Sequence, residues 1–406
     1  MAVVIPSALT IFDALVCAAV VVPFVLLARR RKSIPPLPAA RDGVVLPRLV
    51  VVVPARDEAT AIASAVGSLL AQDYPDLEVV AVDDRSRDGT GDVLRELAAR
   101  DPRLSVLRVD RLPAGWLGKT YALWRGAERA SGSEWLLFTD ADVVHKQGAL
   151  RRAVAYAVSE GLDHLTLTPK LAARGLLLEA FVAFFGYAFV TLWGAYLAND
   201  PKSRRGVGIG AFNLVRREAY EAIGTIRALS LRPDDDIRLG RRLRAFGFLQ
   251  RVLNGREVLS VNWYPSLGAA LVGLEKSLYA SLDYRVADAA AVLLYLVATM
   301  VWPYPGAVLL VGLDRALLLV ALVCLSIGLA ETYRQSTGPL TARALALVAL
   351  LPFSALCFAY AIARSVVLAE TRGVTWRGTR YPLTLLRAQT GLEGAPGRRA
   401  SARNAR

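Results

Sequence analysis

The chain has 406 residues, 54% of them hydrophobic, and its 49 Lys and Arg residues outnumber 35 Asp and Glu residues to give a formal net charge of +14. This hydrophobic content is high for a soluble protein and indicates membrane segments. The basic excess flanks apolar runs, which favours an anionic membrane surface as its partner and disfavours nucleic acid. The three Cys residues lie in apolar runs and there are only two His residues, which disfavours disulfides and a histidine-rich zinc site.

An apolar run at residues 9–27 is about long enough to span a bilayer. Basic residues follow this run at positions 29–32, a pattern that predicts a retained anchor and not a cleaved signal peptide. The positive-inside rule then places the residues after Arg29 in the cytoplasm. We therefore expect a transmembrane anchor at 1–28 and a stiff, basic and proline-rich linker at 29–47.

Short β-rich runs alternate with amphipathic helical runs between residues 49 and 151. The expected strands cover 49–53, 77–82, 104–109 and 134–139, and the expected helices cover 59–72, 89–100 and 118–130. Near-continuous apolar strands separated by helices predict an α/β fold with a mostly parallel sheet that is covered on both faces. Ligand chemistry should then lie in the loops at the strand ends.

Three of these strand ends carry acidic loops, at residues 54–58, 83–90 and 140–142. An isolated Asp-x-Asp is an ordinary turn, but carboxylates that crowd one sheet edge repel unless a cation or hydrogen-bond donors hold them. A sugar nucleotide with a divalent metal supplies both. Asp84 can accept from a base and Asp57 or Glu58 from base or ribose. Asp142 can ligate a metal that bridges the diphosphate.

Residues 115–119 read Gly-Trp-Leu-Gly-Lys and begin a predicted helix. Lys119 at a helix N-terminus can act as a point charge on a phosphate, although an ordinary solvated lysine is the alternative. No Gly-x-Gly-x-x-Gly follows the first strand and no Walker A loop occurs, which disfavours dinucleotide binding and P-loop hydrolysis.

Residues 54–58, 82–90, 118–119 and 139–142 together resemble the motifs of family 2 glycosyltransferases of the GT-A fold, over roughly residues 48–285. The resemblance implies inverting transfer from a UDP- or GDP-sugar with Mg²⁺ or Mn²⁺. It assigns Asp142 and Asp140 to the metal. It assigns these residues to the donor nucleotide: Pro54, Arg56, Asp57, Glu58, Asp84, Lys119 and Asp140. The sequence departs from the family at Asp57, where many relatives carry Asn.

Two later segments extend the resemblance. Residues 206–213 alternate glycine with other residues, which predicts either a bulged strand or, as in the family, a turn at Gly210 and Ala211 that lines the donor sugar. Residues 232–240 begin a helix whose acidic first turn is either a cap or the counterpart of the family's Glu-Asp pair. In the second interpretation Asp236 takes the acceptor hydroxyl's proton, with Asp235 as the reserve.

The acceptor side is less defined. The Gly-Lys motif is similar to that of hopanoid-associated, carotenoid and ceramide glycosyltransferases, and the Gln-x-x-Arg-Trp motif of polymer-making relatives is missing, so a membrane lipid acceptor is expected. Residues 171–197 are dense in aromatic side chains and predict interfacial helices or a span. The expected contacts to the acceptor or the membrane interface are Trp263, Tyr264, Lys276, Trp376, Arg377 and Arg380.

Apolar runs at 289–302, 306–329 and 344–367 predict C-terminal transmembrane helices within residues 286–368, and a basic tail follows at 369–406. Two or four spans would keep that tail in the cytoplasm and three would not, so the number stays open. Asp314 and Arg315 interrupt the middle run, and a loop there would give four short segments. The tail beyond residue 391 is expected to be disordered.

The sequence therefore predicts a membrane-anchored glycosyltransferase whose catalytic domain, residues 48–285, lies in the cytoplasm. One alternative is a polyprenyl-phosphate glycosyltransferase, which would use Arg232, Arg238 and Lys276 around the acceptor phosphate. A second alternative is a membrane scaffold that binds a nucleotide sugar without catalysis.

Overall fold

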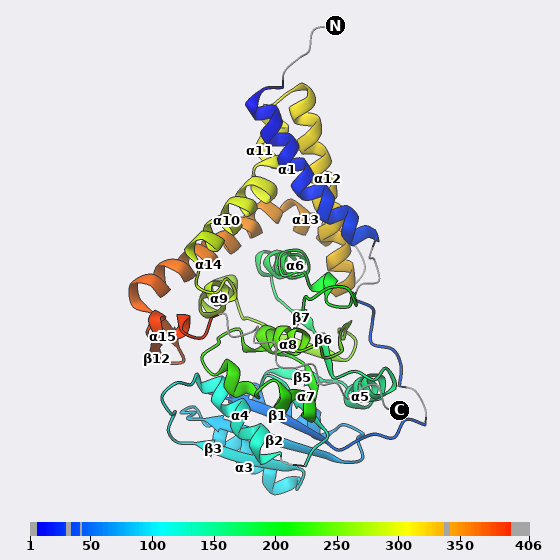
Figure 1. The fold of residues 1–406 in the computed structure, drawn as a ribbon, viewed down its shortest axis with the longest axis vertical. Coiled ribbons are helices and arrows are strands. Elements are labelled where there is room, and N and C mark those ends of the chain that lie inside the picture. Colours follow the sequence, from blue (N-terminus) through cyan, green and yellow to red (C-terminus); the bar gives the residue numbers. More distant parts are fainter. Residues whose placement is uncertain (1–5, 30–33, 41–42, 131, 337–341, 391–406) are drawn as a thin grey trace. The chain divides into compact units, whose positions relative to one another are not determined.

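The structure of the protein is a computed structural model that describes residues 6–29, 34–40, 43–130, 132–336 and 342–390 (Figure 1). The basic residues at 30–32 and the tail from 391 lie outside these ranges. The chain divides into two compact units. The apolar unit comprises Met1–Ser33, Ala173–Tyr196 and Trp263–Leu383, and the α/β unit comprises Ile34–Ala172, Leu197–Asn262 and Thr384–Arg406.

A seven-stranded sheet with the order β3-β2-β1-β4-β8-β6-β9 organises the α/β unit. β1 pairs in parallel with β2 and β4, and β2 with β3. β8 runs antiparallel to β4 and β6, whereas β6 and β9 are parallel. The expected mostly parallel α/β fold is confirmed. The strands are β1 Leu49–Ala55, β2 Leu77–Asp84, β3 Leu104–Val109, β4 Trp135–Phe138, β6 His164–Thr168, β8 Asn213–Arg216 and β9 Gln250–Asn254.

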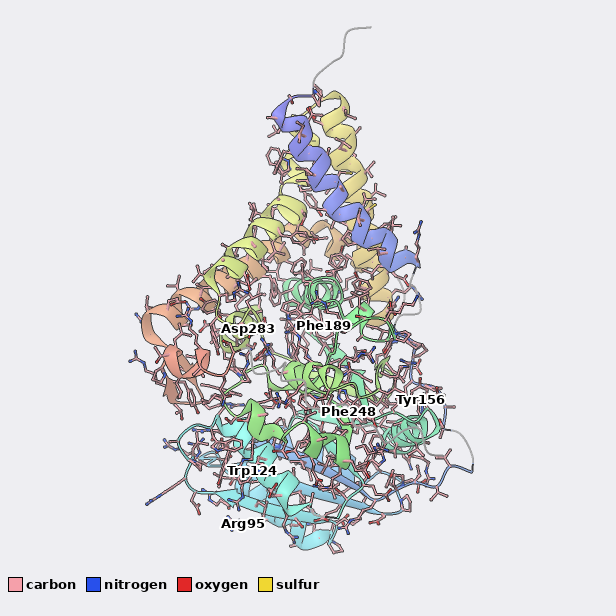
Figure 2. All side chains as sticks on the ribbon, in the orientation of Figure 1. Arg95, Trp124, Tyr156, Phe189, Phe248 and Asp283 are labelled. Atoms are coloured by element: carbon pink, nitrogen blue, oxygen red, sulfur yellow. The ribbon has the colours of Figure 1, made fainter. Side chains whose placement is uncertain are left out.

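Both faces of this sheet are covered by helices, because alternate residues of the buried strands point to opposite sides and pack in two separate cores. Figure 2 draws the side chains on the ribbon and labels Trp124, which packs against one of these cores. Val51 of β1 packs in one core with Val66, whereas Val50 and Val52 pack in another with Leu123. The helices of this unit are α2 Ile62–Leu70, α3 Thr90–Arg100, α4 Gly118–Arg129, α5 Ala149–Ser159, α7 Arg217–Ala222 and α8 Asp235–Ala245, with a short 3₁₀ helix η2 at Ile226–Leu229.

The helix expected at 59–72 begins later, at Ile62. The N–H of Ala59 donates to Oδ2 of Asp88 at 3.0 Å, and Glu58 O accepts from the N–H groups of Ala61 and Ile62. These bonds fold residues 59–61 into a turn that ties the first acidic loop to the second.

Two smaller features complete the α/β unit. A three-stranded sheet with the order β5-β10-β7 is formed by β5 Val143–His145, β7 Lys170–Ala172 and β10 Leu259–Asn262. The proline-rich segment after the anchor lies against the edge strand β9. Asn254 N donates to Pro35 O at 2.8 Å and Leu37 N donates to Asn254 O at 2.9 Å. The segment expected as a linker thus covers the edge of the main sheet.

Helices make up most of the apolar unit. They are α1 Ala8–Arg29, α6 Leu176–Thr191, α9 Leu267–Ser281, α10 Val286–Leu296, the π-helix η3 Val297–Val301, α11 Pro303–Leu309, α12 Gly312–Ser336, α13 Ala342–Ala349 and α14 Leu351–Arg372. A hairpin of β11 Val374–Trp376 and β12 Thr379–Tyr381 follows, and then α15 Leu383–Arg387. In this part of the chain α1 lies along α12 (Figure 1).

Among the described residues, three helices are long and apolar enough to cross a membrane: α1, α12 and α14. The helices Val286–Val301 and Pro303–Leu309 are bent by 42° relative to each other and make a fourth candidate span if they act as one. Two expected runs are broken. The run at 306–329 is interrupted between α11 and α12, where Gly312 has a φ of +63°. The run at 344–367 is interrupted at Leu350, one residue before the first turn of α14 with its proline.

The aromatic residues of 171–197 serve packing inside the apolar unit. Phe181 and Phe184 of α6 are fully buried, and their rings lie 6.5 and 5.7 Å from the ring of Phe358 in α14. The ring of Phe185 lies 4.5 Å from that of Trp263. At 16 residues α6 is shorter than the three candidate spans.

Candidate active site

The loop after β4 is held by the backbone of its neighbours. Thr139 N donates to Val52 O at 3.2 Å, and Thr139 Oγ1 donates to the carbonyl of Ala211 at 2.8 Å. Asp140 N donates to Gly210 O at 3.1 Å. The first acid of the Asp-x-Asp pair is therefore fixed against the glycine-rich segment at the carboxyl end of the sheet.

The glycine-rich segment needs its small residues because it passes between two acidic elements. A Cβ on Gly208 would lie 2.0 Å from Asp236 O. A Cβ on Gly210 would lie 2.5 Å from Asp140 Oδ2 and 3.2 Å from Asp236 Oδ2. Gly210 N also donates to Asp236 Oδ2 at 2.8 Å. Because Gly210 has no side chain, the Asp140 carboxylate from the β4 loop and the Asp236 carboxylate from α8 can both approach its backbone.

Buried side chains support the segment from behind. His164 Nε2 lies 3.0 Å from Asn213 Oδ1, and Gln250 Nε2 donates to His164 Nδ1. Gln250 Oε1 accepts from Val207 N at 3.0 Å, and Asn213 Oδ1 accepts from Ile209 N at 3.3 Å. Because the amide of Gln250 donates to Nδ1, the imidazole is neutral with its proton on Nε2.

The first turn of α8 presents two acids above a buried ion cluster. Asp234 Oδ1 lies 2.9 Å from Arg232 Nε, and its Oδ2 lies 2.7 Å from Arg238 Nε. All three side chains are at most 2% exposed. Asp235 and Asp236 follow directly, and Asp236 Oδ1 accepts from Ile237 N at 2.8 Å. The cluster under Asp234 thus fixes the start of the helix that carries both predicted acids.

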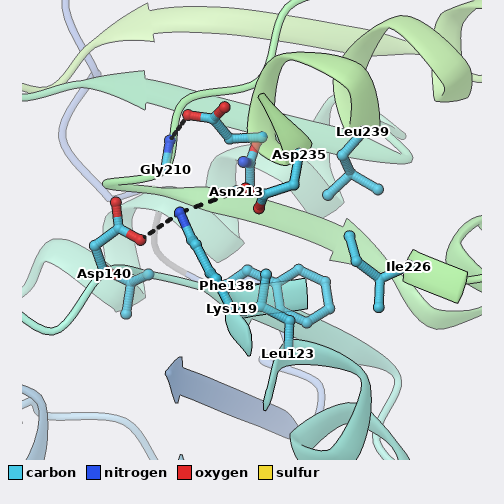
Figure 3. A pocket seen from close by; sticks show the side chains of 11 residues that line it. Lys119, Leu123, Phe138, Asp140, Gly210, Asn213, Ile226, Asp235 and Leu239 are labelled. Atoms are coloured by element: carbon cyan, nitrogen blue, oxygen red, sulfur yellow. Dashed lines mark hydrogen bonds and ion pairs between the residues drawn. The ribbon is translucent and has the colours of Figure 1, made fainter. Parts of the chain in front are cut away.

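Lys119 joins these elements from the first turn of α4. Its Nζ lies 2.7 Å from Asp140 Oδ1 and 3.7 Å from Asp235 Oδ1 (Figure 3). The loop before α8 is tied to the same helix, because Ser230 O accepts from Leu117 N at 2.8 Å. Residues expected from three separate motifs therefore meet around one ammonium group.

A pocket opens at this meeting point (Figure 3). Its charged lining residues are Lys119, Asp140, Asp235 and Asp236. The remaining lining residues are Leu123, Phe138, Thr139, Gly210, Asn213, Ile226 and Leu239. Apart from Gly210, these were not among the expected site residues, and the apolar ones among them have the same sequence signal as ordinary core residues.

Burial and neighbouring negative charges raise the pKa values of Asp142, Asp235 and Asp236. Burial raises the pKa of Asp235 to about 7, against the opposing pull of Lys119. Burial likewise raises the pKa of Asp236. The pKa of Asp142 is raised to about 7 by burial and by the charges of Asp140 and Glu58. Burial alone would lower the pKa of Lys119, but the surrounding carboxylates outweigh it and raise that pKa.

The acidic loops after β1 and β2 bind one another closely. Asp57 N donates to Ser86 Oγ at 3.0 Å, and Asp57 Oδ1 accepts from Arg87 N at 2.8 Å. Asp57 has a φ of +53°, which these bonds hold in place. Pro54, one of the expected donor contacts, lies inside β1 opposite Val82 of β2. The side chain of Asp57 therefore has a structural role in this arrangement.

Asp84 lies at the end of β2 and is nearly buried, with its side chain 4% exposed. Arg85 holds it through two bonds, Nε to Oδ1 at 2.7 Å and NH2 to Oδ2 at 3.0 Å, and Arg56 NH1 lies 3.6 Å from Oδ2. A Cβ on Gly118 would lie 2.1 Å from Asp84 Oδ2. The glycine before Lys119 thus allows α4 to begin directly beside Asp84. Arg85 was not expected from the sequence.

The acceptor residues expected from the sequence lie in the other unit. There the ring of Trp263 lies 4.9 Å from that of Tyr264, and Lys276 Nζ lies 4.5 Å from the ring centre of Trp376. Arg377, with a φ of +47°, forms the turn of the β11–β12 hairpin, and Arg380 Nε donates to the carbonyl of Arg372.

Asp142 carries a carboxylate, the type of ligand that a hard divalent cation prefers. The charges of Asp140 and Glu58 help to raise its pKa, and a bound cation would relieve that repulsion. Within the described ranges, no three His, Cys, Asp or Glu side chains are already grouped as ligands of one ion. Ligands from a bound diphosphate would therefore have to complete the coordination, as Mg²⁺ sites commonly require.

The chain is similar in sequence to known proteins. Residues 50–224 match the sequence model of the family Glycosyl transferase family 2. A GalNAc(5)-diNAcBac-PP-undecaprenol beta-1,3-glucosyltransferase from Campylobacter jejuni is 24% identical over 62% of this chain and 93% of its own length. A 4,4'-diaponeurosporenoate glycosyltransferase from Staphylococcus haemolyticus is 31% identical over 32% of this chain, which spans about a third of that relative (34%).

A solved structure has a similar fold. The mannosyltransferase from Pyrobaculum calidifontis, in complex with GDP-Man and Mn²⁺, superposes with a TM-score of 0.51 and 20% identity. The match covers 89% of this chain and 98% of that protein.

Proposed function

We propose, from the match of residues 50–224 to the model of Glycosyl transferase family 2, that the protein transfers a sugar from a nucleotide-diphosphate sugar to a hydroxyl group of a membrane lipid, with inversion at the anomeric carbon. The position of Lys119 carries the proposal. Its Nζ lies 2.7 Å from Asp140 at the end of β4 and 3.7 Å from Asp235 at the start of α8. Donor-side and acceptor-side groups thereby share one pocket.

The donor nucleotide would bind at the ends of β1 and β2, where Asp84, Asp57 and Glu58 lie. Their carboxylates would accept hydrogen bonds from base and ribose, and Pro54 and Arg56 border the same edge. Lys119 would bind a donor phosphate with its ammonium group. In the absence of donor that ammonium neutralises Asp140. Gly210 and Ala211 would then lie beside the donor sugar.

Asp142 and Asp140 would hold the divalent cation. Bound Mg²⁺ or Mn²⁺ supplies positive charge that stabilises the leaving diphosphate. The raised pKa of Asp142 supports this assignment, since the crowding of Asp140 and Glu58 that causes it would be relieved by a cation.

Asp236 would act as the base, with Asp235 as the reserve. The acceptor oxygen forms a bond to the anomeric carbon as its proton passes to the Asp236 carboxylate, and the bond from that carbon to the diphosphate oxygen breaks with its electron pair. A raised carboxylate pKa suits proton abstraction. The N–H groups of Gly210 and Ile237 orient the carboxylate.

Two observations support a membrane lipid as acceptor. The described part of the chain has three helices able to cross a membrane by length and composition. The similar proteins from Campylobacter and Staphylococcus are named for an undecaprenol-linked and a diaponeurosporenoate substrate. The positive-inside rule supports a multi-pass protein with its α/β unit in the cytoplasm.

A phosphate acceptor finds less support. It would require basic side chains beside Asp236, but Arg232 and Arg238 both pair with the buried carboxylate of Asp234.

Purified full-length protein in lipid nanodiscs, given labelled UDP- and GDP-sugars and a panel of lipids, tests the proposal. We expect label in the organic extract, its loss after EDTA treatment and its return with Mg²⁺ or Mn²⁺. Asp142→Ala and Asp236→Asn should abolish transfer, whereas Asp92→Asn on the exposed face of α3 should not. Equal transfer by the first two variants would refute the assigned chemistry. Donor binding without transfer across the panel would indicate a scaffold.

Mass spectrometry of lipids from cells with and without the intact gene adds a second test. A lipid that gains the mass of one sugar only in the presence of the gene would identify donor sugar and acceptor together. Identical lipid profiles in both strains would contradict a lipid acceptor.

A further inference from the structure

The segment after the last apolar helices returns to the α/β unit. Residues from Thr384 onward cluster with that unit, although they follow α14 and the β11–β12 hairpin in the chain. Leu386 of α15 is fully buried. The turn after α15 is closed by Gln389 N, which donates to Leu386 O at 3.3 Å, and by Thr390 N, which donates to Arg387 O at 3.0 Å. The segment after the hairpin therefore packs on the α/β unit and ends in a hydrogen-bonded turn.

The side-chain amide of Gln389 binds two consecutive residues of the loop before α8. Its Nε2 donates to Ser230 Oγ at 2.9 Å, and its Oε1 accepts from Leu231 N at 3.0 Å. Both residues are nearly buried, at 6% and 3% exposed. The half-buried side chain of Gln389 thus satisfies a backbone donor and a hydroxyl of two buried residues, where an unpaired polar group is costly.

The opposite side of Ser230 is tied to α4. Its carbonyl oxygen accepts from Leu117 N at 2.8 Å and from Thr120 Oγ1 at 2.6 Å. Leu117 and Thr120 are fully buried on either side of Lys119. The loop is therefore held between the helix that carries the lysine and the C-terminal segment.

The same loop leads directly to the candidate acids. Arg232 N donates to Leu229 O at 3.0 Å, and the Arg232 side chain pairs with Asp234. Asp235 and Asp236 come next and face Lys119. A shift of Ser230 and its neighbour would therefore change the position of the acids relative to the lysine.

We propose that Gln389 is a positioning residue for glycosyl transfer. It holds the loop at Ser230 so that Asp235 and Asp236 stay opposite Lys119, and the segment after the apolar helices thereby becomes part of the catalytic architecture. This inference rests on the proposed function. Gln389 acts through the loop and does not touch the reacting atoms.

Three variants in the full-length protein test the role. Gln389→Ala should lower kcat about tenfold, which corresponds to the contribution of about one hydrogen bond to the activation free energy. The KM for the donor should stay within about twofold of the wild-type value. Gln389→Glu should keep most activity, because its carboxylate accepts from Leu231 N and from the Ser230 hydroxyl. Thr390→Ala is the matched control, since Thr390 Oγ1 donates within its own turn, to Arg387 O at 2.8 Å.

A double-mutant cycle separates positioning from a general loss of stability. If Gln389 acts through Ser230, the Ser230→Ala/Gln389→Ala pair should have a kcat close to that of Gln389→Ala alone. Independent, multiplying losses would overturn the proposal, and so would a Gln389→Ala kcat equal to that of the wild type.

Amide hydrogen exchange gives a readout that needs no activity. Peptides that cover residues 229–236 should exchange faster in Gln389→Ala than in the wild type, and peptides of α3 should not change. Unchanged exchange in 229–236 would overturn the positioning role even if transfer is observed. No transfer by the wild type, together with faster exchange in the variant, would refute the proposed function and leave the loop contact standing.

Discussion

Lys119 Nζ lies 2.7 Å from Asp140 Oδ1, although the lysine lies in the first turn of α4 and the aspartate lies in the loop after β4. The contact joins the two sides of the pocket, because the same Nζ lies 3.7 Å from Asp235 of α8. The ammonium group of Lys119 thus stabilises the carboxylates of Asp140 in the β4 loop and Asp235 in α8. The arrangement predicts that donor phosphate would compete with Asp140 for this lysine.

Removing the lysine should leave the acids without their partner. We expect Lys119→Ala to lower kcat by at least about 100-fold, since both phosphate binding and the charge balance of the pocket are lost. The matched control is Lys170→Ala, on an exposed position of β7. Steady-state assays of both variants check this prediction, and more than half of wild-type activity in Lys119→Ala would contradict it.

Gly210→Ala should separate catalysis from folding. The new Cβ would lie 2.5 Å from Asp140 Oδ2, so that carboxylate must move away, and we expect kcat to fall at least about tenfold. Apparent melting temperature should change little, because the carboxylate is a side chain that can shift. Gly67→Ala in α2 is the control, since its Cβ meets nothing within 4 Å. Equal kcat for both variants would show that Gly210 is not needed for catalysis.

Asp234 should matter chiefly for stability. Asp234→Ala leaves Arg232 and Arg238 buried without their shared carboxylate, and we expect about 3–5 kcal/mol of destabilisation. Asp92→Ala removes an exposed pair with Arg95 and should cost less than about 1 kcal/mol. Thermal unfolding in detergent compares the two. Similar melting temperatures would mean that the buried cluster does not stabilise α8.

The two buried histidines predict a loss of stability in acid. Burial lowers the pKa of His145 and of His164 to about 4, below the ordinary value of 6.5. The unfolded chain therefore takes up protons first, so their stabilisation is complete above pH 6.5 and is lost as the pH falls towards 4. Each histidine contributes roughly 3 kcal/mol to this change.

Melting curves between pH 7.5 and 4.5 measure this loss. His164→Gln should show a smaller drop over the range than the wild type, because one titrating group is gone. Parallel curves for the two proteins would contradict the assignment to His164.

Much of the site was predictable because its signals are local. The strand ends near Asp57, Asp84 and Asp140 follow from apolar runs that stop at turn-forming acids, and the helix starts at Gly118 and Asp235 follow from periodicity. Parallel strands place such ends at one sheet edge. The mostly parallel fold was predicted on this basis and is confirmed. The resemblance to family 2 glycosyltransferases rested on the motifs themselves and is confirmed by the family match at residues 50–224.

Charged partners were not predictable in this way. Arg232 and Arg238 were expected near an acceptor phosphate as one alternative, but both pair with Asp234. The exact breaks in the apolar runs, such as that at Gly312, also differ from expectation, because a continuous apolar composition is compatible with either a straight or an interrupted helix.

The sequence by itself determined where the acids, the glycines and Lys119 stand along the chain, and so the class of chemistry. Only the tertiary structure decided that Lys119 pairs with Asp140, that Pro35 binds the edge strand at Asn254, and that Gln389 holds Ser230. Secondary structure follows from interactions between near neighbours, whereas these pairs join segments far apart in the sequence. Their partners are set by packing and by the need to satisfy buried polar groups, which no local pattern records.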